Sequence, residues 1–133
     1  MVGSLPTTEQ LLNDFQKNSS WDKQYKLIIQ LGKKLPAMDA KDKIEPNLVQ
    51  GCESLAWLVI NKEGDFYSFI MDSDTRVVKG LMMILLIVYQ GKSAEQIRSF
   101  DIHGYFAELG LLNHLSPSRS NGLFALIEKI QRG

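Results

Sequence analysis

Residues 81–89 read LMMILLIVY, an unbroken run of nine apolar or aromatic side chains between Lys79 and Lys92. The run is about half of the roughly 20 residues that a membrane-spanning helix needs. A helix of this composition has no polar face to turn toward water, so other parts of the chain must cover it on all sides. We therefore expect a central, buried helix over residues 76–90, with Gly91 near its end.

The composition supplies enough apolar material for one core around such a helix. The chain has 133 residues, of which 44% are hydrophobic and 23% charged, and this is typical of a single globular domain spanning residues 1–133. Its 15 basic and 15 acidic residues cancel, so neither nucleic acid nor a membrane is an expected partner. The first residues contain no signal peptide, and only one cysteine is present, which favours a reducing compartment, the cytoplasm.

Helix-start signals recur along the chain. Capping boxes occur at residues 7–10 (TTEQ) and 93–96 (SAEQ), and Ser20 is an N-cap candidate for a helix between them. A short helix over residues 105–109 should stop near a glycine, and Ser116-Pro117 should begin the last helix. Helices are therefore expected at both ends of the chain.

Two strand-like segments lie between these helical regions. Residues 54–62 and 65–71 are rich in branched and aromatic side chains, and a glycine-containing hairpin connection joins them. Two strands alone are marginally stable, so we expect a third, for which the segment before Gln50 is a candidate. The expected fold is α+β, a small three-stranded antiparallel sheet packed with helices.

Cys52 is the only cysteine and directly follows Gly51, where a loop runs into the first strand. One explanation is a small buried residue that is inert in packing. The other is a reactive thiol, because glycine leaves the sulfur little steric cover. The neighbouring Glu53 carboxylate raises a thiol's pKa, so reactivity would need a cationic counterweight.

Arg119 is one candidate for that counterweight. With Ser116 as N-cap, it occupies the third helical position, where the helix dipole disfavours a cation by about 0.3–1 kcal/mol. It is either an exposed arginine that tolerates this cost or part of an anion site with the free N–H groups of the helix. A thiolate or a persulfide is a suitable anion.

Other polar residues leave further alternatives open. Asp72 and Asp74, two residues apart, suit metal binding or acid–base chemistry, but a helix start explains them fully. A Cys–His hydrolase using His103 or His114 also stays open, because such partners meet in space rather than in sequence.

Five motifs occur along the chain in this order: residues 21–25 (WDKQY) with 31–36 (LGKKLP), 51–54 (GCES) with Trp57-Leu58, 72–74 (DSD), 78–81 (VKGL) and 115–123 (LSPSRSNGL). Taken together, they resemble the SufE family of sulfur-acceptor proteins and its close relative CsdE. The resemblance covers nearly the whole chain, from about Leu11 to the last helix.

The resemblance implies a fold like that of iron–sulfur scaffold proteins and a function in sulfur transfer. Cys52 would take persulfide sulfur from a pyridoxal-phosphate-dependent cysteine desulfurase (SufS- or CsdA-like), stimulate that enzyme, and pass the sulfur to an iron–sulfur scaffold or another acceptor. The chain would carry no cofactor of its own. Gly51, Arg119 and Asp74 would support Cys52, with Asp74 helping to hold the surrounding loop through capping hydrogen bonds. The alternative is a non-catalytic module that uses the same fold to regulate a partner.

Two adjacent positions depart from the family pattern. A polar Gln or Arg followed by Val is common after the Gly-Cys-x-Ser/Asn element, whereas this chain has Leu55 and Ala56. The change leaves the chemistry of the thiol intact. It leaves open which partner the chain prefers.

Overall fold

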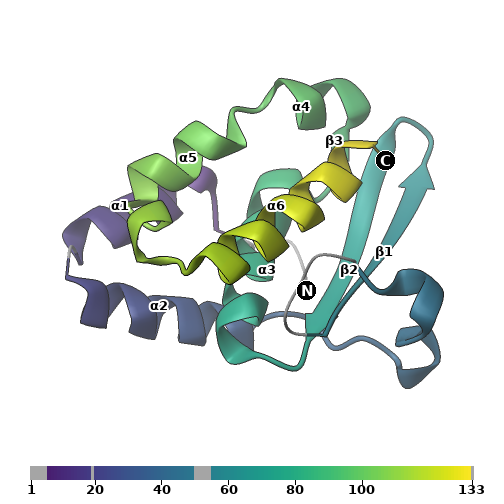
Figure 1. Cartoon of the computed structure of the whole chain (residues 1–133). Coiled ribbons are helices and arrows are strands. Elements are labelled where there is room, and N and C mark those ends of the chain that lie inside the picture. The colour runs from purple at the N-terminus through teal and green to yellow at the C-terminus, as the bar shows by residue number, and fades with distance from the viewer. Residues whose placement is uncertain (1–5, 19, 50–54, 133) are drawn as a thin grey trace.

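The computed structural model describes residues 6–18, 20–49 and 55–132. Within them the chain forms six α-helices and one three-stranded antiparallel sheet, so the expected α+β class is confirmed (Figure 1). The helices are α1 (Thr8–Lys17), α2 (Trp21–Lys33), α3 (Arg76–Tyr89), α4 (Ala94–Ser99), α5 (Ile102–Leu109) and α6 (Pro117–Arg132). The strands are β1 (Ala56–Glu63), β2 (Phe66–Ser73) and β3 (Lys92–Ser93).

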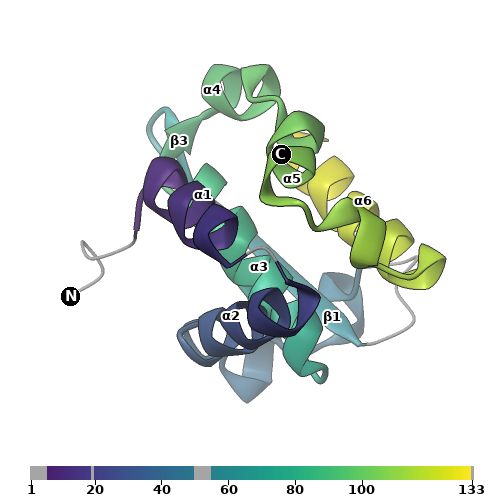
Figure 2. The same cartoon turned by 90° about the vertical axis from the view of Figure 1, so that its left-hand side faces the viewer.

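Helix α3 is the centre of the fold, as its composition predicts. Every residue from Gly80 to Tyr89 is buried. The sheet lies on one side of α3, and helices α1 and α2 lie on the other side. Helix α6 runs across α3 (Figures 1 and 2). No helix in the described part of the chain is long and apolar enough to cross a membrane.

The hairpin of β1 and β2 pairs eight residues on each strand, from Ala56 opposite Ser73 to Glu63 opposite Phe66. A two-residue connection joins the strands, one residue later than the sequence pattern suggests. Its Gly64 has φ 61°, a backbone conformation that glycine adopts without the steric cost other residues incur.

The third strand is not the segment before Gln50. Leu48 makes only a single bridge to Trp57, and the third strand is β3, which follows α3 and pairs with the beginning of β2. The amide of Gly91 donates a hydrogen bond to the carbonyl of Tyr67 (2.8 Å), which brings the chain back to the sheet. A two-residue strand has no sequence periodicity, so the pattern could not indicate it.

The helix starts largely follow the local signals. Both expected capping boxes form, and Ser20 caps α2. The amide of Arg119 donates to the hydroxyl of Ser116 (3.2 Å), which confirms Ser116 as the cap of α6. Helix α5 begins three residues earlier than expected, because the side chain of Asp101 accepts a hydrogen bond from the amide of Gly104.

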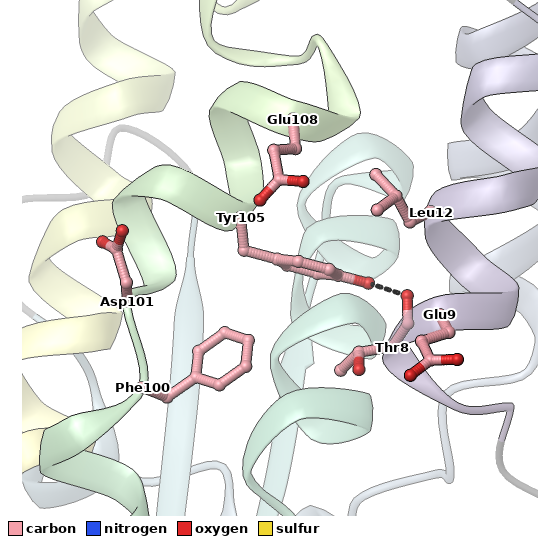
Figure 3. A pocket seen from close by; sticks show the side chains of 7 residues that line it. All are labelled: Thr8, Glu9, Leu12, Phe100, Asp101, Tyr105 and Glu108. Carbon is pink, nitrogen blue, oxygen red and sulfur yellow. Dashed lines mark hydrogen bonds between the residues drawn. The ribbon is translucent and has the colours of Figure 1, made fainter.

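Helix α1 is attached to the rest of the fold through its main chain. The buried side-chain amide of Gln24, in α2, donates to the carbonyl oxygens of Phe15 in α1 (3.4 Å) and Leu109 in α5 (3.3 Å). The hydroxyl of Tyr105, also in α5, donates to the carbonyl of Thr8 (2.7 Å; Figure 3). Side chains of α2 and α5 thus both bind carbonyl oxygens of α1.

Helices α2 and α3 approach each other at two glycines. A Cβ on Gly32 would lie 2.9 Å from the amide nitrogen of Gly80 and 3.0 Å from the carbonyl oxygen of Arg76. A Cβ on Gly80 would overlap the carbonyl oxygen and the Cγ2 methyl of Ile28. Because main-chain atoms cannot move aside as a flexible side chain can, this crossing requires glycine.

We therefore expect Gly80→Ala to lower the free energy of unfolding by about 2 kcal/mol or more, because the clash with Ile28 forces α2 and α3 apart. Helix propensity alone would favour alanine by about 1 kcal/mol. Denaturant unfolding measures the difference, with Gln30→Ala on the exposed side of α2 as the control. A Gly80→Ala chain as stable as wild type would show that the crossing tolerates a methyl group.

Candidate functional site

Cys52 and Gly51, the centre of the expected site, lie outside the described residues. The residues that border their segment are described, and each is attached to the sheet. On the preceding side, the amide of the buried Val49 donates to the carbonyl of Ala56 (2.8 Å), and Leu48 bridges Trp57. The chain therefore reaches Gln50 from a fixed position beside the start of β1.

On the following side, Leu55 is held at the junction of β2 and α3. Its carbonyl accepts hydrogen bonds from the hydroxyl of Ser73 (2.7 Å) and from the amide of Asp74 (3.4 Å). Ser73 is only 4% exposed, so water competes little for the first of these bonds. The Leu55 side chain nevertheless remains 49% exposed.

Asp72 lies next to this anchor and is the one charged residue that is buried in the described part of the chain. Its carboxylate pairs with the ammonium groups of Lys43 (3.0 Å) and Lys79 (3.6 Å) and accepts a hydrogen bond from the amide of Ser73 (2.8 Å). Burial by itself raises the pKa of Asp72, but the hydrogen bonds and the two lysine charges outweigh it and bring the pKa below its ordinary value. The carboxylate is thus ionised at neutral pH.

The prediction that residues 72–74 cap a helix is wrong for Asp72, because its carboxylate forms ion pairs with Lys43 and Lys79 instead. The N-cap position of α3 belongs to Thr75. The Ser73 hydroxyl accepts from the Thr75 amide (3.2 Å) while it donates to Leu55, and the Asp74 carboxylate accepts from the Thr75 hydroxyl (3.1 Å). Asp74 reaches Leu55 through its amide rather than its carboxylate.

Arg119 occupies the first turn of α6, as expected. Its Nη1 atom is buried and finds no hydrogen-bond acceptor in the described part of the chain. The first turns of α3 and α6 and the beginning of β1 all lie in the lower half of Figures 1 and 2. An unpaired guanidinium nitrogen out of water is costly, which suits a group that binds an anion.

Both histidines make ring contacts elsewhere. His114 stacks on Trp21 with ring centres 4.6 Å apart, and His103 lies against Phe124 at 4.9 Å. Among residues 6–18, 20–49 and 55–132, no three histidine, cysteine, aspartate or glutamate side chains gather as metal ligands would.

A pocket of about 280 Å³ lies between α1 and α5. Figure 3 shows the side chains that line it. Burial, with a smaller effect from Glu108, raises the pKa of Tyr105 to about 12, so its hydroxyl stays protonated and bonded to Thr8. Helices α1 and α5 lie on the left of Figure 1, away from the beginning of β1. The residues that line the pocket are Thr8, Glu9, Leu12, Phe100, Asp101, Tyr105 and Glu108.

Replacing Asp72 by asparagine should lower the free energy of unfolding at pH 7 by about 1–2 kcal/mol, because two lysines lose their carboxylate. The pKa of Asp72 is lower in the folded chain than in the unfolded chain. Its contribution to stability is therefore fully present at pH values above the unfolded-state pKa and is lost as the pH falls through the folded-state pKa. Urea unfolding of both chains at pH 7 and pH 3 measures the effect. A difference that persists undiminished at pH 3 would contradict the ionic origin.

Comparison with known proteins agrees with this architecture. A solution structure of a hypothetical protein from Thermus thermophilus superimposes with a TM-score of 0.74 at 20% identity, over 94% of this chain and 90% of that one, and so shares the fold. The family model for SufE, described as an Fe–S metabolism associated domain, matches residues 9–133. Because that match spans nearly the whole sequence, the chain belongs to the SufE family and has a role in Fe–S metabolism.

Proposed function

We propose that this chain is a sulfur carrier that accepts persulfide sulfur on Cys52 from a cysteine desulfurase and passes it on for iron–sulfur cluster assembly. Membership of the SufE family supports the role in Fe–S metabolism, and Cys52 is the only thiol that the sequence offers. The observation that carries the proposal is that both borders of the Cys52 segment, Val49 and Leu55, are bonded to the sheet. The two residues that border the segment of the nucleophile are thus fixed before a second protein arrives.

The transfer needs a thiolate and no metal. The Cys52 thiolate attacks the outer sulfur of the donor persulfide, the donor S–S bond breaks, and the donor cysteine leaves as a thiolate. A persulfide then resides on Cys52, and no net oxidation or reduction occurs. The pyridoxal phosphate of the partner liberates the sulfur from cysteine, so the carrier uses no cofactor of its own. These reducing-compartment reactions suit a cytoplasmic protein.

Arg119 would complement the negative charge on sulfur. Its buried, unpaired Nη1 offers a hydrogen-bond donor to an anion, whereas in the first turn of α6 Pro117 has no N–H group and the Arg119 amide already donates to the Ser116 hydroxyl. A charge-assisted hydrogen bond to the thiolate or persulfide stabilises the form that reacts. Asp74 supports the same region through the hydrogen bond that its main-chain amide donates to the carbonyl of Leu55.

Cys52→Ser should abolish sulfur uptake and stimulation of the desulfurase while leaving the melting temperature unchanged, because serine is similar in size but a far weaker nucleophile. Mass spectrometry after incubation with desulfurase and cysteine measures uptake as the added mass of one sulfur atom on Cys52. If Cys52→Ser still stimulates the desulfurase, the protein acts as a binding module. An unfolded variant would instead identify Cys52 as a structural residue.

Arg119→Ala should slow sulfur acceptance about tenfold or more with little change in the free energy of unfolding, because its Nη1 makes no internal hydrogen bond that folding would lose. Arg119→Lys, which keeps the charge but not the planar fork of donors, should fall between Arg119→Ala and wild type. The rate of persulfide formation on Cys52 is the measurement. Normal acceptance by Arg119→Ala would make the arginine a tolerated charge without a role.

A further inference from the structure

We infer that Leu55 is the docking anchor of this chain, an exposed apolar side chain that enters an apolar pocket beside the persulfide donor of the desulfurase. The inference rests on the proposed function, because it assigns the occupant of this surface to the same partner. Three observations lead to it: the position of Leu55 in the chain, the bonds on its carbonyl, and the exposure of its side chain.

Position makes contact with the partner unavoidable. Leu55 follows Cys52 by three residues, so its Cα lies within roughly 10 Å of the Cα of Cys52 even in a fully extended chain. A typical protein interface covers about 800 Å² on each partner, a patch of roughly 16 Å radius. An interface centred on Cys52 therefore extends over the position of Leu55.

The bonds on Leu55 fix its backbone before the partner arrives. Its carbonyl accepts hydrogen bonds from the buried Ser73 hydroxyl and from the Asp74 amide. The next residue, Ala56, pairs with Ser73 in the sheet, and its carbonyl accepts a hydrogen bond from the amide of Val49. Little backbone freedom remains to be lost on binding, and an anchor that is already in place binds more tightly than one that must first be ordered.

The chemistry of the side chain defines the partner's pocket. An isobutyl group that is 49% exposed gains by leaving water only if its new surroundings are apolar. Asp74 and Arg76 are exposed at the start of α3 nearby and can form a polar rim around the contact. The structure thus describes one half of an interface with an apolar centre and a charged edge.

The test compares dissociation constants for complexes with the desulfurase, measured by titration calorimetry without cysteine present. Leu55→Ala should weaken binding about five- to tenfold, and the near-isosteric Leu55→Asn at least as much, since each removes apolar surface that the partner buries. Leu55 is exposed in the free chain, so both variants should retain the fold. Phe66→Ala is the control, because Phe66 is 56% exposed but lies at the far end of the hairpin, roughly 23 Å along the strand from Ala56.

A second variant tests whether the anchor is held by Ser73. Ser73→Ala removes the hydrogen bond to the Leu55 carbonyl and should weaken binding severalfold in the wild-type background. In the Leu55→Ala background the same change should have little further effect, because Ser73 acts through Leu55. Independent, additive losses from the two changes would contradict this positioning role.

The outcomes separate this inference from the proposed function. If Leu55→Ala and Leu55→Asn bind as tightly as wild type, or if Phe66→Ala weakens binding equally, the anchor is disproved even when Cys52 accepts sulfur normally. If binding depends on Leu55 but no sulfur reaches Cys52, the carrier function is disproved and the anchor stands. A wild-type chain that does not bind the desulfurase overturns both.

Discussion

Helix α3 is buried on every side over ten consecutive residues, and this burial organises the rest of the molecule. β2 packs against α3 on one side, α2 crosses it at two glycines, and α6 also packs against it. Only its first turn emerges from the core, at the exposed Arg76. The polar groups that border the candidate site gather at that end, at the junction of β2 and α3.

The ion pairs of Asp72 with Lys43 and Lys79 connect parts of the chain that are far apart in sequence. The Asp72 side chain, only 10% exposed, joins the segment containing Lys43 to α3 through Lys79. Its carboxylate also accepts a hydrogen bond from the Ser73 amide and so orients the residue that holds Leu55. The two lysines remain partly in water, which keeps the cost of removing their charge from solvent small. A chain without net charge can thus still place a strong local interaction where its geometry requires one.

Local signals predicted most helix starts, because a capping box needs only residues three apart in sequence. The all-apolar run predicted the central helix for the same reason. The ion pair of Asp72 with Lys43 links residues 29 positions apart, so no local sequence pattern could predict it. The short strand β3 forms only because the end of α3 lies next to the beginning of β2, which is a property of the tertiary structure. For the candidate site, the motifs included Ser73 and Lys79 without giving them a role and missed Lys43. Arg119 lies in the first turn of α6 as expected, and its role and those of Cys52 and Gly51 stay predictions.

The attachment of α1 has an evolutionary consequence. Gln24 and Tyr105 bind carbonyl oxygens of Phe15 and Thr8, groups that every amino acid possesses. Substitutions on the outer surface of α1 therefore leave both bonds available, and this helix is free to diverge among descendants of the chain. An inserted or deleted residue in α1 is different, since it rotates later carbonyls by about 100° and shifts them by about 1.5 Å. Selection on α1 should accordingly preserve its length more strictly than its exposed sequence.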